Sequence, residues 1–190
     1  MTRYLQRMAL PIWISLLILH CGPASQESAT IGDLSTINQE PPPARMAAAA
    51  ILHPTKGHTT EGIVSFEEMD GRIHIMAHII GLAPGSYSIH IHEKGDCTSG
   101  DGQSAGEIFN PDRSATTETA AGNLGQIKAD DSGMVHLEID VDRIALTEGP
   151  TSVVGRSVIV HSGPGVAASL LACGVIEPQA ADAVREGSGM

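Results

Sequence analysis

Short hydrophobic runs separated by Gly, Pro or Asp turn signals dominate the chain after residue 45. In the run RIHIMAHII, residues 72–80, aliphatic side chains alternate with histidine and methionine. Successive side chains of a β-strand point to opposite faces, so this alternation predicts a strand with one buried face. By the same criteria the sequence predicts strands over residues 46–54, 62–68, 72–80, 85–92, 125–129, 134–141, 157–161 and 172–176.

The pattern favours an all-β fold, an eight-stranded antiparallel Greek-key sandwich or flattened barrel that is immunoglobulin-like. Composition agrees, because the 190 residues include 21 glycines and 11 prolines but only 3% aromatic residues, which suits a turn-rich β protein. No internal repeat or heptad pattern is present, which excludes solenoids and long helical assemblies.

The residues before and after this domain have a different character. Arg3 and Arg7 precede an apolar run that is too short to span a bilayer, so we expect residues 1–21 to be a secretory signal peptide. Residues 22–45 are rich in Ser, Pro, Gln and Glu and predict a flexible linker. The β-domain is then expected over 46–177, followed by a C-terminal tail over 178–190.

Two interpretations of Cys21 stay open. It ends the apolar run at the position where bacterial lipoproteins carry their lipidated cysteine, although His20 stands where a small residue is usual. Cys21 is therefore either a lipidation site or part of an ordinarily cleaved signal. In both cases we expect an exported protein, in the periplasm or anchored to the outer membrane, with no membrane contact except through such a lipid.

Net charge and cysteine content narrow the function further. The formal charge of −11 argues against nucleic acid as a partner, because phosphate binding needs clustered Lys and Arg. In an oxidising compartment, the two cysteines other than Cys21 are expected to form one disulfide between Cys97 and Cys173.

The segment HIHEKGDC carries the candidate chemistry. His90 and His92 stand two residues apart on a predicted strand, so their imidazoles share a face and make half of a metal site. An unoccupied polar face is the simpler interpretation of such a pair. His161, which ends the predicted strand SVIVH, is a candidate third ligand, and three imidazoles suit copper or zinc.

Five ordered motifs, GSYSIHIHEKGDC, SAGEIFNP, GNLGQIKADDSG, GRSVIVHSG and LACGVI, resemble the Cu/Zn superoxide dismutase family. The resemblance implies that His90, His92 and His161 bind one copper ion. It also implies a disulfide between Cys97 and Cys173 and superoxide as the small-molecule substrate. A homodimer is a candidate assembly, since members of this family dimerise in more than one manner.

The chain departs from the family pattern wherever zinc would be held. Ile108 stands at the position of the histidine that bridges copper and zinc, Ala120 at that of a later zinc histidine, and Asn123 at that of the zinc aspartate. The loop between them contains no histidine, so zinc is not expected. Glu107 and Asp112 are the remaining local carboxylates, and zinc binding by these two in place of the lost ligands is the weaker alternative.

Leu170 stands where the family has an arginine beside the copper, and the loop before it is short and lacks charge. A positively lined cleft raises the encounter rate with an anion, so we expect weak attraction of superoxide. We therefore predict a copper-only, superoxide dismutase-like antioxidant oxidoreductase of the cell envelope with weak activity. The alternatives are a non-catalytic copper-binding or copper-handling protein and a purely structural domain, and no catalytic side chain is assigned.

Other histidines have a second interpretation. His74, Met76 and His78 share one face of a predicted strand, and two imidazoles with a thioether are donors for Cu(I). An exposed polar face on an outer strand is the simpler interpretation, and their role stays open. The remaining histidines, among them His136, are expected to be solvated, and Arg156 is expected to orient a loop.

Overall fold

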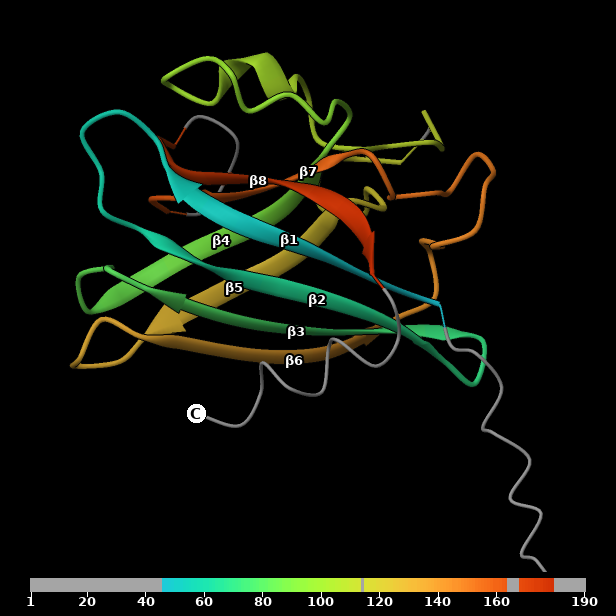
Figure 1. Cartoon of the computed structure of the whole chain (residues 1–190), viewed down its shortest axis with the longest axis horizontal. Coiled ribbons are helices and arrows are strands. Elements are labelled where there is room, and N and C mark those ends of the chain that lie inside the picture. The colour runs from blue at the N-terminus through green and yellow to red at the C-terminus, as the bar shows by residue number, and fades with distance from the viewer. Residues whose placement is uncertain (1–45, 114, 164–167, 180–190) are drawn as a thin grey trace, which may run out of the picture. The chain divides into compact units, whose positions relative to one another are not determined.

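Eight strands make up the computed structural model, which describes residues 46–113, 115–163 and 168–179 (Figure 1). Each predicted run overlaps one strand, and the expectation of an all-β antiparallel fold is confirmed. The bounds are β1 Ala47–Pro54, β2 Glu61–Met69, β3 Arg72–Ile80, β4 Gly85–His92, β5 Asn123–Ala129, β6 Val135–Val141, β7 Ser157–His161 and β8 Leu170–Gln179.

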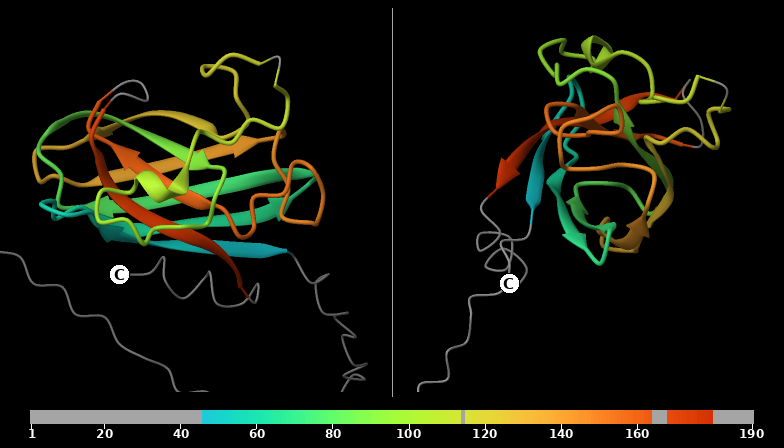
Figure 2. Two further views of the ribbon diagram at one scale, coloured as in Figure 1. Left: turned by 90° about the horizontal axis from the view of Figure 1, so that it is seen from above. Right: turned by 90° about the vertical axis from the view of Figure 1, so that its right-hand side faces the viewer.

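The strands are hydrogen-bonded in the order β5-β4-β7-β8-β1-β2-β3-β6. Neighbours in this order are antiparallel, and the pairings of β4 with β7 and of β3 with β6 join strands that are distant in the sequence. Seen along the strands, the sheet curls into a nearly closed barrel (Figure 2). This arrangement brings β4 and β7, the two strands that carry the predicted metal ligands, into direct contact.

The barrel interior is filled by the aliphatic faces of the strands. On β3, Ile73, Ile75 and Ile79 are buried, while His74, Met76 and His78 alternate with them on the outer face. Because burial of apolar surface drives folding, this alternation fixes which face of each strand points inward. Phe66 on β2 is fully buried in the same core.

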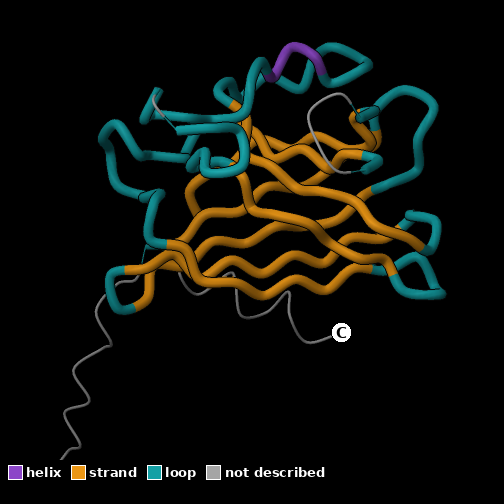
Figure 3. Tube along the Cα trace, turned by 180° about the vertical axis from the view of Figure 1, so that it is seen from behind, coloured by secondary structure: helices purple, strands orange, loops and turns teal. Residues whose placement is uncertain are grey.

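A disulfide between Cys97 and Cys173 ties the long loop after β4 to β8, as the sequence predicts. The two Cα atoms lie 5.7 Å apart. The loop contains one turn of 3₁₀ helix, Gln103–Ala105, drawn in purple in Figure 3. The turn was not predicted, because three residues are too few for a periodic signal.

The expected signal peptide, the linker, Cys21 and most of the C-terminal tail lie outside the described residues. Strand β8 continues to Gln179, three residues past the predicted end of that strand at 176. Among the described residues, no helix has the length and apolarity needed to cross a membrane.

Candidate metal centre

His90 and His92 project from β4, and His161 projects from the end of the neighbouring strand β7. The antiparallel register pairs Ser88 with His161 and His90 with Ile159, which places the three histidines on the same outer face of the barrel. All three are nevertheless buried, with exposed fractions of 4%, 4% and 1% respectively. Loop segments cover them, so the imidazoles form an enclosed group.

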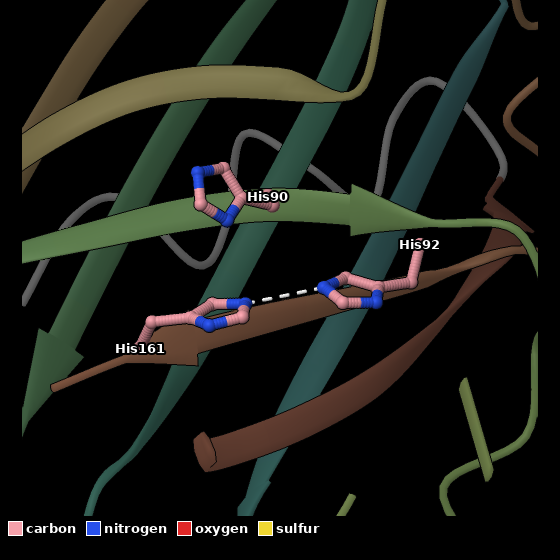
Figure 4. Close-up of side chains that lie close together, drawn as sticks. All are labelled: His90, His92 and His161. Carbon is pink, nitrogen blue, oxygen red and sulfur yellow. Dashed lines mark hydrogen bonds between the residues drawn. The ribbon is translucent and has the colours of Figure 1, made fainter. Parts of the chain in front are cut away.

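The three imidazole rings lie close together and face a common space (Figure 4). The Nε2 atoms of His92 and His161 lie 3.1 Å apart, and the ring of His90 stands edge-on to that of His161 at a centroid distance of 4.7 Å. One potential ligand atom from each histidine lies within 4.8 Å of the other two. Among the residues that the structure describes, this is the one convergent group of three or more His, Cys, Asp or Glu.

Hydrogen bonding indicates how the rings are protonated. Nδ1 of His92 donates to the carbonyl oxygen of Gly106 at 2.8 Å, which leaves its Nε2 with a free lone pair. Nδ1 of His90 and Nδ1 of His161 are buried and have no hydrogen-bond partner. Buried nitrogens without a partner carry a desolvation cost, which a bound cation would offset by accepting lone pairs. The donor set therefore fits a metal ion.

The surroundings keep the three imidazoles neutral at physiological pH. Burial, followed by the charge of His92, lowers the pKa of His90 to about 4, although a hydrogen bond with the Asn123 side chain opposes the shift. Burial, followed by the charges of His90 and His92, lowers the pKa of His161 to about 3. Burial also lowers the pKa of His92. Neutral imidazole is the form that binds a metal ion.

Asn123, the first residue of β5, lies between His90 and the loop that precedes β5. Its side-chain amide donates to the carbonyl of Glu118 at 2.9 Å, and its Oδ1 accepts from the backbone N–H of Gly125 at 3.0 Å. Asn123 also lies opposite His90 in the register of β4 and β5 and raises the pKa of its ring, so this one residue adjoins ligand, loop and strand. The sequence identified Asn123 only as a lost zinc ligand; the pairing of β4 with β5 reveals its contact with His90.

A cleft of about 510 Å³ leads to His90. Its lining consists of Ser88, His90, Thr117, Glu118, Asn123, Gly125 and Gln126. Glu118 is the charged side chain of this lining, and neither Lys nor Arg is present among the described residues that form it. The described part of the cleft wall therefore offers no cation to attract an anion.

Ile108, Ala120 and Leu170, which depart from the family pattern, lie outside the lining of the His90 cleft. Ile108 pairs with His92 through an isolated β-bridge, and its buried aliphatic side chain has no atom that coordinates a metal. Ile108, Ala120 and Glu107 line a second cleft of about 390 Å³. Leu170 packs with Cys173 and Ile159 beneath the disulfide loop and is not part of the lining of the His90 cleft.

Arg156 lies in the turn before β7 and bonds to two other segments. Its Nη1 donates to the carbonyl of Glu93 and its Nε to that of Ser152, each at 2.7 Å. The guanidinium also lies 3.7 Å above the ring of Phe109. These contacts agree with a role in orienting loops.

Comparisons with known proteins agree with this geometry. The family model for copper/zinc superoxide dismutase matches residues 60–176. The chain is similar to superoxide dismutase [Cu-Zn] 2 of Brassica juncea, with 37% identity over 62% of this chain and 78% of the relative. It is also similar to the extracellular superoxide dismutase [Cu-Zn] of Brugia pahangi, with 35% identity over 60% of this chain and 59% of the relative. Among solved structures, the clock protein EA4 matches with a TM-score of 0.61 and 31% identity, over 70% of this chain and 95% of that one.

Proposed function

Because the chain belongs to the copper/zinc superoxide dismutase family, we propose that it binds one copper ion at His90, His92 and His161 and dismutes superoxide there. The observation that carries the proposal is the convergence of three buried imidazoles, two of which have an Nδ1 atom without a partner. The overall reaction converts two superoxide anions and two protons into one molecule of oxygen and one of hydrogen peroxide.

The residues around the centre position the three imidazoles, keep them neutral and enclose them. A copper ion held by three imidazoles can alternate between two oxidation states, which is the electron exchange that dismutation requires. The carbonyl of Gly106 orients the His92 ring through its Nδ1 proton, and Asn123 lies opposite His90 in the pairing of β4 with β5. Since the side chain of Ile108 carries no titratable group, solvent must deliver the protons in this chain.

We propose that the centre works without zinc. Ile108, Ala120 and Asn123 offer neither an imidazole nor a carboxylate at the positions that match the family's zinc ligands. The amide of Asn123 instead holds the adjacent loop by donating to the Glu118 carbonyl. A hydrogen bond thus replaces a metal as the link between this loop and the barrel.

Weak activity is part of the proposal. The lining of the His90 cleft contains Glu118 and no basic side chain among the described residues, and the whole chain carries a formal charge of −11. Negative charge at the mouth of a cleft repels an anionic substrate, so the rate of encounter should be low. The buried position of Leu170 supports this, since nothing there offers a guanidinium to superoxide.

The cell envelope is the proposed location, either in the periplasm or on the outer membrane through a lipid at Cys21. The Cys97–Cys173 disulfide supports an oxidising compartment. One relative is named an extracellular superoxide dismutase, which favours export for this chain as well. Mass spectrometry of the mature N-terminus from the native host would test the lipid.

Metal analysis joined to a superoxide-decay assay tests the function. The purified protein, reconstituted with copper and offered zinc, should retain one copper and no zinc, and it should accelerate superoxide decay above free buffer. The acidic lining of the cleft favours one alternative, a copper-binding or copper-handling protein without catalysis. One bound copper with no acceleration would support that alternative and contradict the enzyme.

A further inference from the structure

Strands β3 and β6 lie apart from β4 and β7, the strands that carry the three-histidine centre (Figure 1). The outer face of β3 and β6 carries a second group of side chains with potential ligand atoms. The antiparallel register places three pairs side by side on this face. They are His74 with Asp140, Met76 with Glu138, and His78 with His136. Residues directly opposite on neighbouring strands have their Cβ atoms close together, so each pair can act on one ligand.

His78 and His136 form the closest of these pairs. Their rings stack with centroids 4.6 Å apart and an angle of 14° between the planes. Nε2 of His136 lies 3.1 Å from Sδ of Met134, the residue immediately before β6. Both imidazoles are exposed, and no hydrogen bond joins the ring of His78 to any described residue. Two nitrogen donors and one sulfur donor are therefore available together at the surface.

His74 on the same face provides a contrast. Its Nδ1 lies 2.9 Å from a carboxylate oxygen of Asp140, and its Nε2 lies 3.4 Å from one of Glu138. Both nitrogens are thus occupied by carboxylates, and the ring is half-buried. His74 is held as a partner of acidic groups, whereas His136 contacts the thioether of Met134 and the ring of His78 has no hydrogen bond to a described residue.

We propose that His78, His136 and Met134 form a second metal site, which binds Cu(I). A thioether is a soft ligand that favours Cu(I), and imidazole binds copper readily. A hard cation such as Mg²⁺ or Ca²⁺ requires oxygen ligands, which this trio does not supply. The inference goes beyond the proposed dismutase centre, because it requires none of His90, His92 or His161.

The surroundings of the pair suit a site that exchanges metal with solution. Ile63 on β2 lies opposite His78 in the register and is 42% exposed, so it provides an apolar wall on one side of the site. Lone pairs of an imidazole lie in the plane of its ring. The stacked rings must therefore rotate about their side-chain torsions to direct two nitrogens at one ion, and their exposure permits this. Binding should consequently separate the stacked rings.

Stoichiometry of Cu(I) binding to the full chain tests the proposal. Under reducing but disulfide-sparing conditions, protein would be titrated against a chromophoric Cu(I) chelator. The expected result is two equivalents for the natural sequence and one for His136→Ala. Met134→Leu should weaken the second equivalent by roughly tenfold or more, since removing even an outer partner of a metal ligand costs that much. His74→Ala is the matched control and should still bind two.

The variants keep the two sites distinguishable. His161→Ala should lose the first equivalent and retain the one on β3 and β6, so failure of the proposed dismutase centre would leave this site measurable. A nuclear magnetic resonance titration with Ag(I), a redox-inert probe, should shift the imidazole signals of His78 and His136. A His161→Ala variant that binds no Cu(I), or a His136→Ala variant that binds as many equivalents as the natural sequence, would overturn the proposal. Silver-induced shifts confined to the other histidines would do the same.

Discussion

Nε2 of His92 and Nε2 of His161 face each other at 3.1 Å, although 69 positions separate the two residues in the chain. The contact exists because β4 and β7 are neighbours in the barrel. Two ring nitrogens at this distance either share a proton or direct their lone pairs at a common ion. Together with His90, this pair gives the proposed copper centre its capacity to bind a metal ion.

Replacement of His161 tests that capacity. His161→Ala removes one of three ligands, and copper affinity should fall by roughly 100-fold or more. His58→Ala, at an exposed histidine in the loop after β1, is the control and should leave affinity unchanged. Competition with a copper chelator gives the comparison. Equal affinity in both variants would remove His161 from the site.

Stability of the metal-free protein should depend on pH. The pKa values of His90 and His161 are lowered by burial to about 4 and about 3, whereas the unfolded chain titrates near 6.5. As pH falls below 6.5, the unfolded state takes up protons that the folded state does not, so the free energy of unfolding decreases. The melting temperature of metal-free protein should drop by several degrees between pH 7 and pH 5.

Bound metal gives the matched comparison for this pH series. An ion that occupies the imidazoles adds stability at every pH at which it stays bound, so the loaded protein should melt at a higher temperature throughout. A melting temperature of the metal-free protein that does not change between pH 7 and pH 5 would show that the imidazoles are not held neutral by burial.

Asn123 should support the metal centre from outside it. Asn123→Ala removes the amide that lies opposite His90 and holds the Glu118 carbonyl, so copper affinity is expected to fall by roughly 10- to 100-fold. Gln126→Ala, on the same strand and in the same cleft, is the control. If both variants bound copper as tightly as the natural sequence, Asn123 would make no contribution to copper affinity.

Reversal of charge at the cleft should raise activity if the protein is a dismutase. Glu118→Lys replaces the acidic side chain of the cleft lining with a cation, which should increase kcat/KM for superoxide and make it fall with ionic strength. Glu61→Lys makes the same change in net charge at the exposed beginning of β2. A gain of equal size in both variants would assign the effect to net charge and contradict a role for the cleft.

Reduction of the Cys97–Cys173 disulfide should lower stability. The bond closes a loop of about 77 residues, for which a chain-entropy account gives on the order of 4 to 5 kcal/mol. Differential scanning calorimetry with and without reductant should show a melting temperature several degrees lower after reduction. A double variant with serine at both positions should melt at the lower temperature and be insensitive to reductant.

The sequence by itself determined the strands and the donors. Period-two alternation, as in residues 72–80, decides which side chains enter the core, because a shift by one residue would expose the three buried isoleucines of β3, Ile73, Ile75 and Ile79. The spacing of His90 and His92 places both rings on one face for the same reason. The loss of histidine at Ile108 and Ala120 is likewise visible without coordinates.

The tertiary structure decided which distant groups meet. Pairing of β4 with β7 brings His161 to His92, and pairing of β4 with β5 brings Asn123 to His90. Pairing of β3 with β6 stacks His78 on His136. The sequence predicts a strand face for His78 and a solvated side chain for His136, and it does not predict their contact. Local patterns carry no information about which strand lies beside which, because that choice depends on how the whole barrel buries its apolar faces.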